Sequence, residues 1–335
     1  MEAWRAAVKL RHLLIASNAV RNHWRSLSLT AKYPTLSSSS TESEESGRET
    51  HFGFKTVSED EKQEKVDSVF TNVAEKYDLM NDVMSGGVHR LWKDYFVSRL
   101  GPTPGSKILD VAGGTGDIAF RILKYANNES ETGVSDDIDD ISVPRELQFQ
   151  AQSFINPDTE DVVTPPAPKL TEVTVCDINQ SMLDVGMKRA RAFGLSKQLN
   201  WLQSNAEHLE AVPDNTYDAY TIAYGIRNCT HIDRVISEAY RVLKPGGRFM
   251  CLEFSQVNNA VLRMIYDEYS FQVIPVMGKI VAGDWDSYQY LVESIRQFPP
   301  QEEFKDMIRA AGFKFVTFEN IFGGVTAIHS GFKLK

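Results

Sequence analysis

The chain has 335 residues, of which 42% are hydrophobic and 24% are charged, the composition of a globular protein with a full core. No stretch of it approaches the roughly 20 consecutive apolar residues that cross a bilayer. Residues 1–41 hold six basic residues and one acidic residue, a local charge of +5, so the remainder carries −14 against −9 for the whole chain. An acidic body is poorly suited to binding a phosphate backbone, and we expect no nucleic acid partner.

The three cysteines, Cys176, Cys229 and Cys251, lie far apart and follow no CxxC or Cys–His spacing. This spacing argues against a zinc site and against a disulfide framework, and it suits a reducing compartment. We therefore expect no metal and three free thiols.

The first fifty residues have the features of a targeting segment. Residues 1–41 are basic, poor in acids and rich in serine at residues 37–40, which is the composition of a mitochondrial transit peptide. The apolar run at residues 13–15 is too short for a secretory signal. A disordered tail is the alternative. We assign residues 1–50 to a transit peptide with its linker and residues 51–335 to one folded domain.

The segment from Lys107 to Asp117, KILDVAGGTGD, carries the first functional signal. A short apolar run predicts a buried parallel strand, a glycine turn follows, and residues 118–124 have helical periodicity. A strand, a turn and a helix in this order place a ligand at the carboxyl edge of a sheet, facing the helix N-terminus. The glycine spacing also fits the loose dinucleotide motif, so a nicotinamide oxidoreductase is an alternative.

Two further strands are predicted to end in ligand-binding residues. The strand over residues 173–177 ends at Asp177, whose carboxylate could accept hydrogen bonds from both hydroxyls of a ribose. Asn179 or Ser181 is suited to cap the next helix. The strand after it leads into Asn205 and Ala206, at the position where an adenine ring is usually contacted, although asparagine also caps turns.

Residues 127–169 are rich in Asp, Ser and Pro. Such a composition cannot bury enough apolar surface to order itself, so we predict a disordered surface insertion between two core elements. The run of aspartates at residues 136–140 is interpreted as solvated charge rather than a metal site.

The loop and the elements around it resemble the class I S-adenosylmethionine-dependent methyltransferases. Asp110 fits the DxGxGxG motif of that class, with Ala112 in place of the first glycine, and the LKPGG turn at residues 243–247 is typical of it. This class implies a doubly wound, Rossmann-like α/β fold with a mostly parallel seven-stranded sheet. It also implies S-adenosyl-L-methionine as cofactor, with Gly114, Thr115 and Gly116 beside its amino-acid part.

Four strings are similar to one narrower family, the UbiE-type C-methyltransferases of ubiquinone and menaquinone biosynthesis. They are KYDLMNDVMS at 76–85, HRLWK at 89–93, DVAGGTGD at 110–117 and YGIRN at 224–228. The resemblance covers roughly residues 66–335 apart from the insertion. It implies cofactor contacts by Thr115, Asp177, Asn205 and Ala206. At Ala223, where a serine is usual, it implies a contact through the backbone.

With a mitochondrial leader, the resemblance implies C-methylation of a polyprenylated methoxy-benzoquinol ring in ubiquinone (coenzyme Q) biosynthesis. It further implies a peripheral position on the matrix side of the inner mitochondrial membrane, a multi-protein coenzyme Q biosynthetic complex and a homodimer. The alternatives are another lipid or phenolic acceptor, and a non-catalytic scaffold that binds the cofactor.

Ring methylation requires an electron-rich phenolate, an aligned methyl group and removal of a ring proton. Arg227 and Asn228 follow the strand at residues 217–223, near where the methyl group should project. Arg227 is a poor base but could stabilise a phenolate or orient a water, which Asn228 could hold. Tyr77, in a predicted lid over about residues 60–100, is a candidate for orienting the substrate. An apolar segment over about residues 255–300 is predicted to form a roof for the polyprenyl tail, with core packing and dimer contacts as alternatives.

Overall fold

The computed structural model describes residues 48–73, 77–131, 170–281, 283 and 285–335. The strands are β1 (Glu49–Phe52), β2 (Lys55–Ser58), β3 (Lys107–Val111), β4 (Glu172–Asp177), β5 (Leu199–Gln203), β6 (Tyr217–Ala223), β7 (Leu243–Phe254), β8 (Lys314–Ile321) and β9 (Thr326–Phe332). The α-helices are α3 (Glu59–Val73), α4 (Tyr77–Ser85), α5 (Val88–Leu100), α6 (Asp117–Glu131), α8 (Gln180–Ala192), α9 (Ile232–Val242), α10 (Ala260–Glu268), α11 (Ile274–Val281), α12 (Asp286–Gln297) and α13 (Gln301–Ala310). Shorter turns of helix are η2 (Ile226–Asn228), η3 (Tyr269–Val273) and η4 (Phe322–Gly324).

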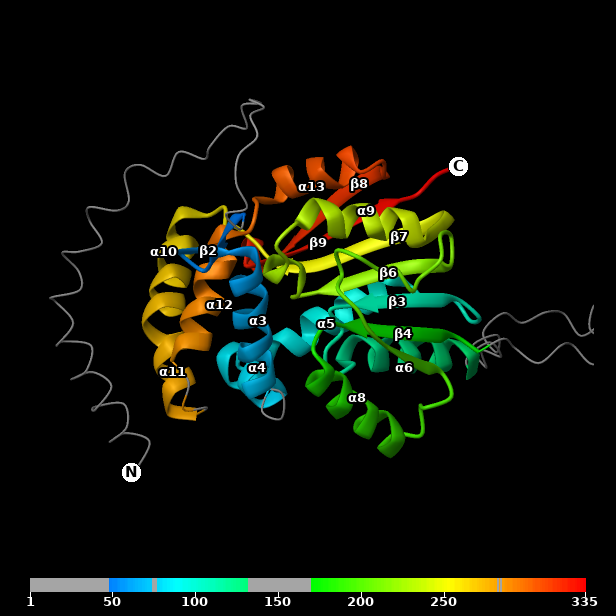
Figure 1. Ribbon diagram of the computed structural model, residues 1–335, viewed down its shortest axis with the longest axis horizontal. Helices are drawn as coiled ribbons and strands as arrows, with labels where there is room; N and C mark the ends of the chain where they lie inside the picture. Colours follow the sequence, from blue (N-terminus) through cyan, green and yellow to red (C-terminus); the bar gives the residue numbers. More distant parts are fainter. Residues whose placement is uncertain (1–47, 74–76, 132–169, 282, 284) are drawn as a thin grey trace, which may run out of the picture. The chain divides into compact units, whose positions relative to one another are not determined.

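The centre of the fold is a seven-stranded sheet with the order β5-β4-β3-β6-β7-β9-β8 (Figure 1). The five strands from β5 to β7 run parallel, and β9 pairs antiparallel with both β7 and β8. The strand order reverses between β3 and β6, which is where open α/β sheets bind ligands. The predicted doubly wound, mostly parallel seven-stranded sheet is confirmed.

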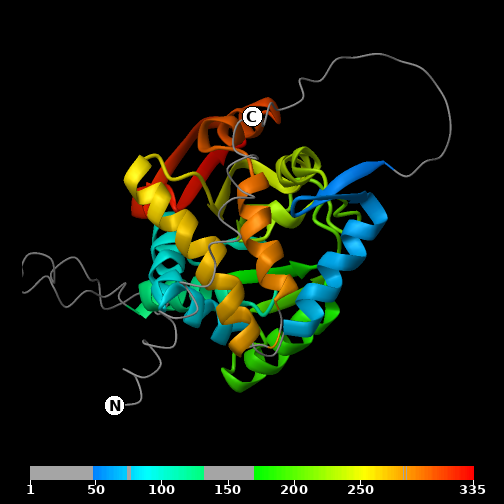
Figure 2. The ribbon, with the colours of Figure 1, turned by 90° about the vertical axis from the view of Figure 1, so that its left-hand side faces the viewer.

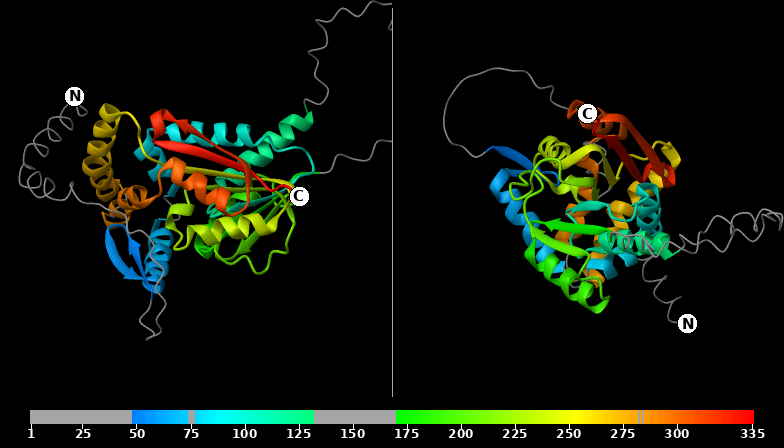
Figure 3. Two further views of the ribbon diagram at one scale, coloured as in Figure 1. Left: turned by 90° about the horizontal axis from the view of Figure 1, so that it is seen from above. Right: turned by 90° about the vertical axis from the view of Figure 1, so that its right-hand side faces the viewer.

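Helices cover both faces of this sheet, as its apolar strands require. One face is packed by α5, α6 and α8, whose apolar side chains join Ile108, Val173 and Val175 in one buried cluster. The other face is packed by α9 and α13, whose apolar residues surround Leu109 and Tyr220. Viewed from above in Figure 3, α5 and α6 lie on one side of the strands and α9 and α13 on the other.

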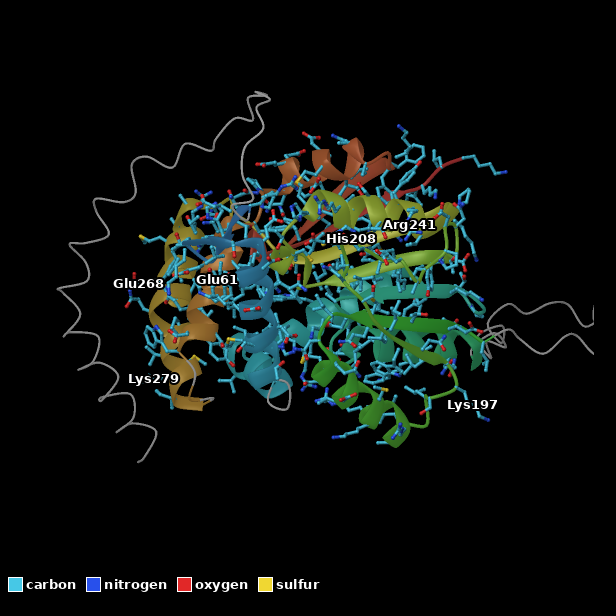
Figure 4. The ribbon with its side chains drawn as sticks, viewed as in Figure 1. Glu61, Lys197, His208, Arg241, Glu268 and Lys279 are labelled. Carbon is cyan, nitrogen blue, oxygen red and sulfur yellow. The ribbon has the colours of Figure 1, made fainter. Side chains whose placement is uncertain are left out.

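A further group of elements lies beyond the carboxyl ends of the parallel strands. It contains the β1–β2 hairpin and the helices α3, α4, α10, α11 and α12, and Figure 2 shows this side facing the viewer. Glu268 and Lys279 of this group are exposed and point away from the sheet (Figure 4). None of the described helices combines the length and apolar content needed to cross a bilayer.

Two local predictions differ from the structure. Helix α6 continues to Glu131, beyond the predicted start of the insertion at residue 127, and residues 132–169 lie outside the described part of the chain. The predicted Pro-Gly-Gly turn lies within the bounds of β7. There Gly246, with a φ of 87°, donates its N–H to the Lys333 carbonyl, and the pairing of β7 with β6 is irregular.

Candidate active site

A cavity of about 700 Å³ lies at the carboxyl ends of β3, β4 and β6, under the helices of the second group. Most of the predicted site residues border it: Asp110, Gly114, Thr115, Asp177, Asn205, Ala206, Ala223, Arg227 and Asn228. Gly116 does not border it; its φ is 82°, and a Cβ there would lie 3.0 Å from the Trp201 ring. Tyr77 begins α4, but its side chain lies outside the described part of the structure.

The glycine loop after β3 is fixed by contacts that side chains would prevent. A Cβ at Gly113 would lie 2.7 Å from Val175 and 2.9 Å from Asp110 Oδ2, so a larger residue cannot pack there. Gly114 has a φ of 53°, and its N–H donates to Asp177 Oδ2 at 2.8 Å. Arg189 donates to the buried Thr115 hydroxyl at 3.2 Å. The loop therefore presents a rigid run of backbone to the cavity.

Asp177 is joined to both the loop and the next helix. Besides Gly114, the backbone N–H of Asn179 donates to its other oxygen at 2.9 Å. Burial raises the pKa of Asp177, and the backbone donors oppose that shift. Each carboxylate oxygen can accept more than one hydrogen bond, so the side chain retains acceptor capacity for a diol. Asn179 also caps α8 through Met182, as one of the two predicted caps.

Asp110 lies fully buried beneath the loop. Its Oδ1 accepts from Thr221 at 2.8 Å, while Oδ2 has no hydrogen-bond partner within the described residues. Burial raises the pKa of this carboxyl to about 7. An unsatisfied acid at the cavity wall fits the positive ammonium group of the methionine part of S-adenosylmethionine.

Asn205 both lines the cavity and closes a turn, the two roles that its place in the sequence allowed. It borders the cavity, and its Oδ1 accepts from the Glu207 backbone at 2.9 Å, which closes a turn. Because the side-chain oxygen is occupied by the turn, Asn205 and the adjacent Ala206 present mainly backbone and the amide nitrogen at this end of the cavity.

The loop after β6 forms a strained elbow. Tyr224 has a φ of 57°, and η2 then carries Arg227 and Asn228 over the cavity. Ala112, in the glycine loop, also has a positive φ of 49°. A Cβ at Gly225 would lie 2.3 Å from the Ala112 Cβ, so the missing side chain at Gly225 makes room for the alanine that replaces the usual glycine.

Arg227 forms an ion pair with Glu253, which lies at the end of β7. The guanidinium Nη1 donates to Glu253 Oε1 at 2.8 Å and to the Tyr224 carbonyl at 2.5 Å, and both charged side chains are buried. Burial raises the pKa of Glu253, and the ion pair with Arg227 opposes it. Glu253 itself does not border the cavity. Arg227 is thus both an ion-pair partner in the elbow and a cation at the cavity wall.

Helix α3 closes the cofactor end of the cavity. Its Asp67 and Thr71 accept from Asn179 Nδ2 at 2.8 and 2.7 Å, and its buried Lys62 donates to the Cys229 carbonyl at 3.1 Å. Glu59, at its first residue, lies 3.2 Å from His231 in the loop after the elbow. These contacts join the predicted lid to both the cofactor end and the elbow after β6.

The sequence did not identify Lys93 and Tyr290 as site residues. Lys93 is buried on α5, borders the cavity and pairs with Asp117 at 2.8 Å. Tyr290 borders it from α12. Lys93 lies in the HRLWK string, which indicated the family but did not indicate what Lys93 does. His89, in the same string, borders the cavity, and burial lowers its pKa to about 4, so this imidazole is neutral near pH 7.

A sheet of this order, with an acidic strand end beside a glycine loop that borders a large cavity, defines a class I S-adenosylmethionine-dependent methyltransferase. A family model described as the ubiE/COQ5 methyltransferase family matches residues 56–333. The chain belongs to this family. The predicted family, methyltransferase activity and cofactor are thereby confirmed.

Individual relatives agree with this placement. The mitochondrial 2-methoxy-6-polyprenyl-1,4-benzoquinol methylase of Bos taurus is 55% identical over 291 residues, which cover 87% of this chain and 86% of the relative. The protein of the same name from Homo sapiens is 54% identical with the same coverage. The crystal structure of the cyclase SpnF is similar with a TM-score of 0.51 and 18% identity, covering 80% of this chain and 96% of that one, which is a likeness of fold alone.

Proposed function

We propose that this chain transfers a methyl group from S-adenosylmethionine to a ring carbon of a polyprenylated methoxy-benzoquinol in ubiquinone biosynthesis. The observation that carries the proposal is one continuous cavity in which three different surfaces meet. Polar strand ends lie at one end, the Arg227–Asn228 elbow lies in the middle, and an apolar roof lies beyond it. The name shared by the relatives of more than half identity supports the same acceptor.

The proposed cofactor contacts follow from the geometry of the polar end. Asp177 accepts from the ribose hydroxyls, Asp110 faces the methionine ammonium, and the backbone of Gly114 and Thr115 lines the amino-acid part. The remaining contacts are proposed at Asn205, Ala206 and Ala223. When bound, S-adenosylmethionine supplies an electrophilic methyl group on a positive sulfur.

The proposed catalytic residues activate the acceptor ring. A ring carbon beside a phenolate would donate an electron pair to the methyl carbon while the bond from that carbon to sulfur breaks, and the same ring carbon would then lose its proton to a water molecule. Arg227 stabilises the phenolate oxygen, because a fixed cation with a buried side chain stabilises developing negative charge strongly. Asn228 holds the same oxygen or a water beside it, and Tyr77 orients the ring.

The apolar end of the cavity is proposed to hold the polyprenyl tail. The wall there includes Leu262, Ile265 and Phe322, from α10 and η4. Ile265 and Phe322 are also 59% and 65% exposed, so the cavity reaches the surface between these two elements. A tail longer than the cavity would leave the protein at this place.

A peripheral position on the matrix side of the inner mitochondrial membrane fits this exit. Helix α10 has no buried residue and exposes Val261, Met264 and Ile265. Flotation with neutral phosphatidylcholine vesicles tests the attachment. Native mass spectrometry tests the proposed homodimer, and cross-linking in mitochondria tests the multi-protein coenzyme Q complex.

The proposed organisation of the chain keeps the predicted boundaries. Residues 1–50 form a mitochondrial transit peptide and linker, residues 60–100 contain the lid and residues 255–300 form the roof. The N-terminal sequence of the protein isolated from mitochondria tests whether a transit peptide is removed within residues 1–50. A mature chain that still begins at Met1 would contradict it.

An acceptor competition tests the function. The full chain is incubated with methyl-labelled S-adenosylmethionine and an equimolar mixture of a prenylated methoxy-benzoquinol, a catechol and a sterol, and the products are fragmented by mass spectrometry. We expect label on a ring carbon of the benzoquinol. Label on another acceptor would assign a different substrate, and cofactor binding without transfer would favour a scaffold.

A further inference from the structure

Tyr290 connects the catalytic elbow to the N-terminal hairpin. We infer that Tyr290, held in place by the β1–β2 hairpin, is a positioning residue that fixes the amide of Asn228 toward the substrate. This inference rests on the proposed function, because it assigns to Asn228 a contact with the quinol oxygen.

The first step is the contact at the elbow. The Tyr290 hydroxyl donates to Asn228 Oδ1 at 3.1 Å, and the Tyr290 side chain is buried on the inner face of α12. Both residues border the cavity. Because the amide oxygen is engaged by the hydroxyl, the amide nitrogen, which carries only donors, is turned away from Tyr290. An N–H donor beside Arg227 is what a developing phenolate oxygen requires.

The second step is the contact that holds Tyr290 itself. The Phe52 ring of β1 stacks on the Tyr290 ring with a centroid distance of 4.0 Å and an angle of 8° between the planes. Lys65 of α3 places its ammonium 5.5 Å from the Phe52 centroid. Stacking on one face holds the tyrosine ring in place and so fixes the position of its hydroxyl oxygen beside Asn228.

A second attachment fixes the hairpin to the same helix. The Phe54 N–H donates to Glu293 Oε2 at 3.0 Å, and Gln289 donates to the other oxygen of Glu293 at 2.7 Å. Gly53, with a φ of 59°, allows this approach, since a Cβ there would lie 2.2 Å from Glu293 Oε2. The hairpin is therefore attached to α12 at two points, one turn of the helix apart.

This arrangement places active-site support at the end of the predicted leader and linker, residues 1–50. The hairpin starts at Glu49, and its last residue before the turn is Phe52. Proteolytic processing that removed Phe52 would leave Tyr290 without its stacking partner. We therefore expect the mature chain to begin before Glu49.

Two pairs of variants test the inference. Tyr290→Phe removes the hydroxyl and Phe52→Ala removes the stack. The matched controls are Tyr217→Phe, which loses a hydroxyl bound to Thr174 outside the cavity, and Phe54→Ala, which removes the other hairpin ring. With a prenylated methoxy-benzoquinol, we expect both test variants to lower kcat about tenfold, while the Kd for S-adenosylhomocysteine changes less than about twofold. The controls should match the wild type.

Combined variants separate positioning from general destabilisation. Adding Tyr290→Phe to Asn228→Ala should lower kcat no further than Asn228→Ala alone, because the hydroxyl acts through the amide. Asn228→Asp, which keeps the acceptor for Tyr290 and loses the N–H donors, should be as impaired as Asn228→Ala. Multiplying effects in the double variant, or an active Asn228→Asp, would overturn the inference.

Hydrogen exchange of the peptide covering residues 224–231 provides a readout that needs no substrate. We expect faster exchange in Tyr290→Phe and Phe52→Ala and unchanged exchange in the two controls. Unchanged exchange in all four variants would overturn the inference. If the wild type methylates no benzoquinol, the proposed function fails, and the exchange data still decide whether Tyr290 positions the elbow.

Discussion

The two ends of the cavity are built in different ways. The cofactor end consists of strand ends and tight loops, in which backbone groups and carboxylates are joined by hydrogen bonds such as Gly114 to Asp177. The roof consists of helices that contribute apolar side chains and few polar contacts. A small polar cofactor requires donors and acceptors at fixed places, whereas a flexible apolar tail requires only volume and apolar surface. The elbow with Arg227 and Asn228 lies where the polar cofactor end meets the apolar roof.

Removing Arg227 should have the largest effect and should separate the two ends. Arg227→Ala leaves the buried Glu253 carboxylate without its cation and removes the charge beside the phenolate, so we expect kcat to fall by about 100- to 1000-fold. Steady-state kinetics with the benzoquinol measures this. The Kd for S-adenosylhomocysteine should stay within about threefold, and a comparable loss of cofactor affinity would show that Arg227 belongs to the cofactor end.

The contact between Gly225 and Ala112 should have the next largest effect. Gly225→Ala places two Cβ atoms 2.3 Å apart, so one of the two loops must move, and we expect methyl transfer to fall by about 100-fold. Ala112→Gly removes one of the two atoms, and in the Gly225→Ala background it should restore most of the rate. A double variant no better than Gly225→Ala would contradict the proposed fit between the loops.

The buried Asp110 should make cofactor affinity depend on pH. Its pKa is raised to about 7 by burial, so the carboxyl is largely protonated below that pH and cannot pair with an ammonium group. Calorimetry with S-adenosylhomocysteine should therefore give weaker binding as pH falls below 7, by at most about tenfold per pH unit. Asp110→Asn should bind weakly and lose this dependence. An unchanged slope in that variant would assign the titration to another group.

Changes in the roof should have the smallest effect and should depend on the acceptor. Ile265→Asp places a charge at the apolar exit, which should raise KM for a long-tailed benzoquinol by about tenfold while leaving an untailed one nearly unchanged. Glu268→Gln, on the same helix but pointing outward, is the matched control. Equal changes for both acceptors in Ile265→Asp would show that this end of the cavity does not hold the tail.

The sequence predicted the cofactor end well because its geometry is local. A buried strand, a glycine turn and the start of a helix are read within about ten residues, and Asp177 needs only its place at a strand end. The structure adds that Asp110 is fully buried and that Gly116 serves the turn rather than the cavity.

The middle and roof could not be predicted to the same depth. The pair of Arg227 and Glu253 joins the ends of two neighbouring strands that are separated by helix α9, and only the strand order brings them together. Phe52 and Tyr290 are 238 positions apart in the chain and meet through tertiary packing. No sequence motif indicates either contact, although the position of Glu253 at the end of a strand was a signal that it lies near the site. The apolar content of residues 255–300 indicated a roof but not which side chains face the cavity.

The central claim is that one cavity brings an activated methyl group to a ring carbon of a tailed benzoquinol. The most direct test is carbon NMR of the product formed by the full chain from S-adenosylmethionine labelled with ¹³C at the methyl group. The account predicts a single new resonance of a methyl group on an aromatic carbon, absent with Arg227→Ala. A methoxy resonance, or no transfer although the cofactor binds, would contradict it.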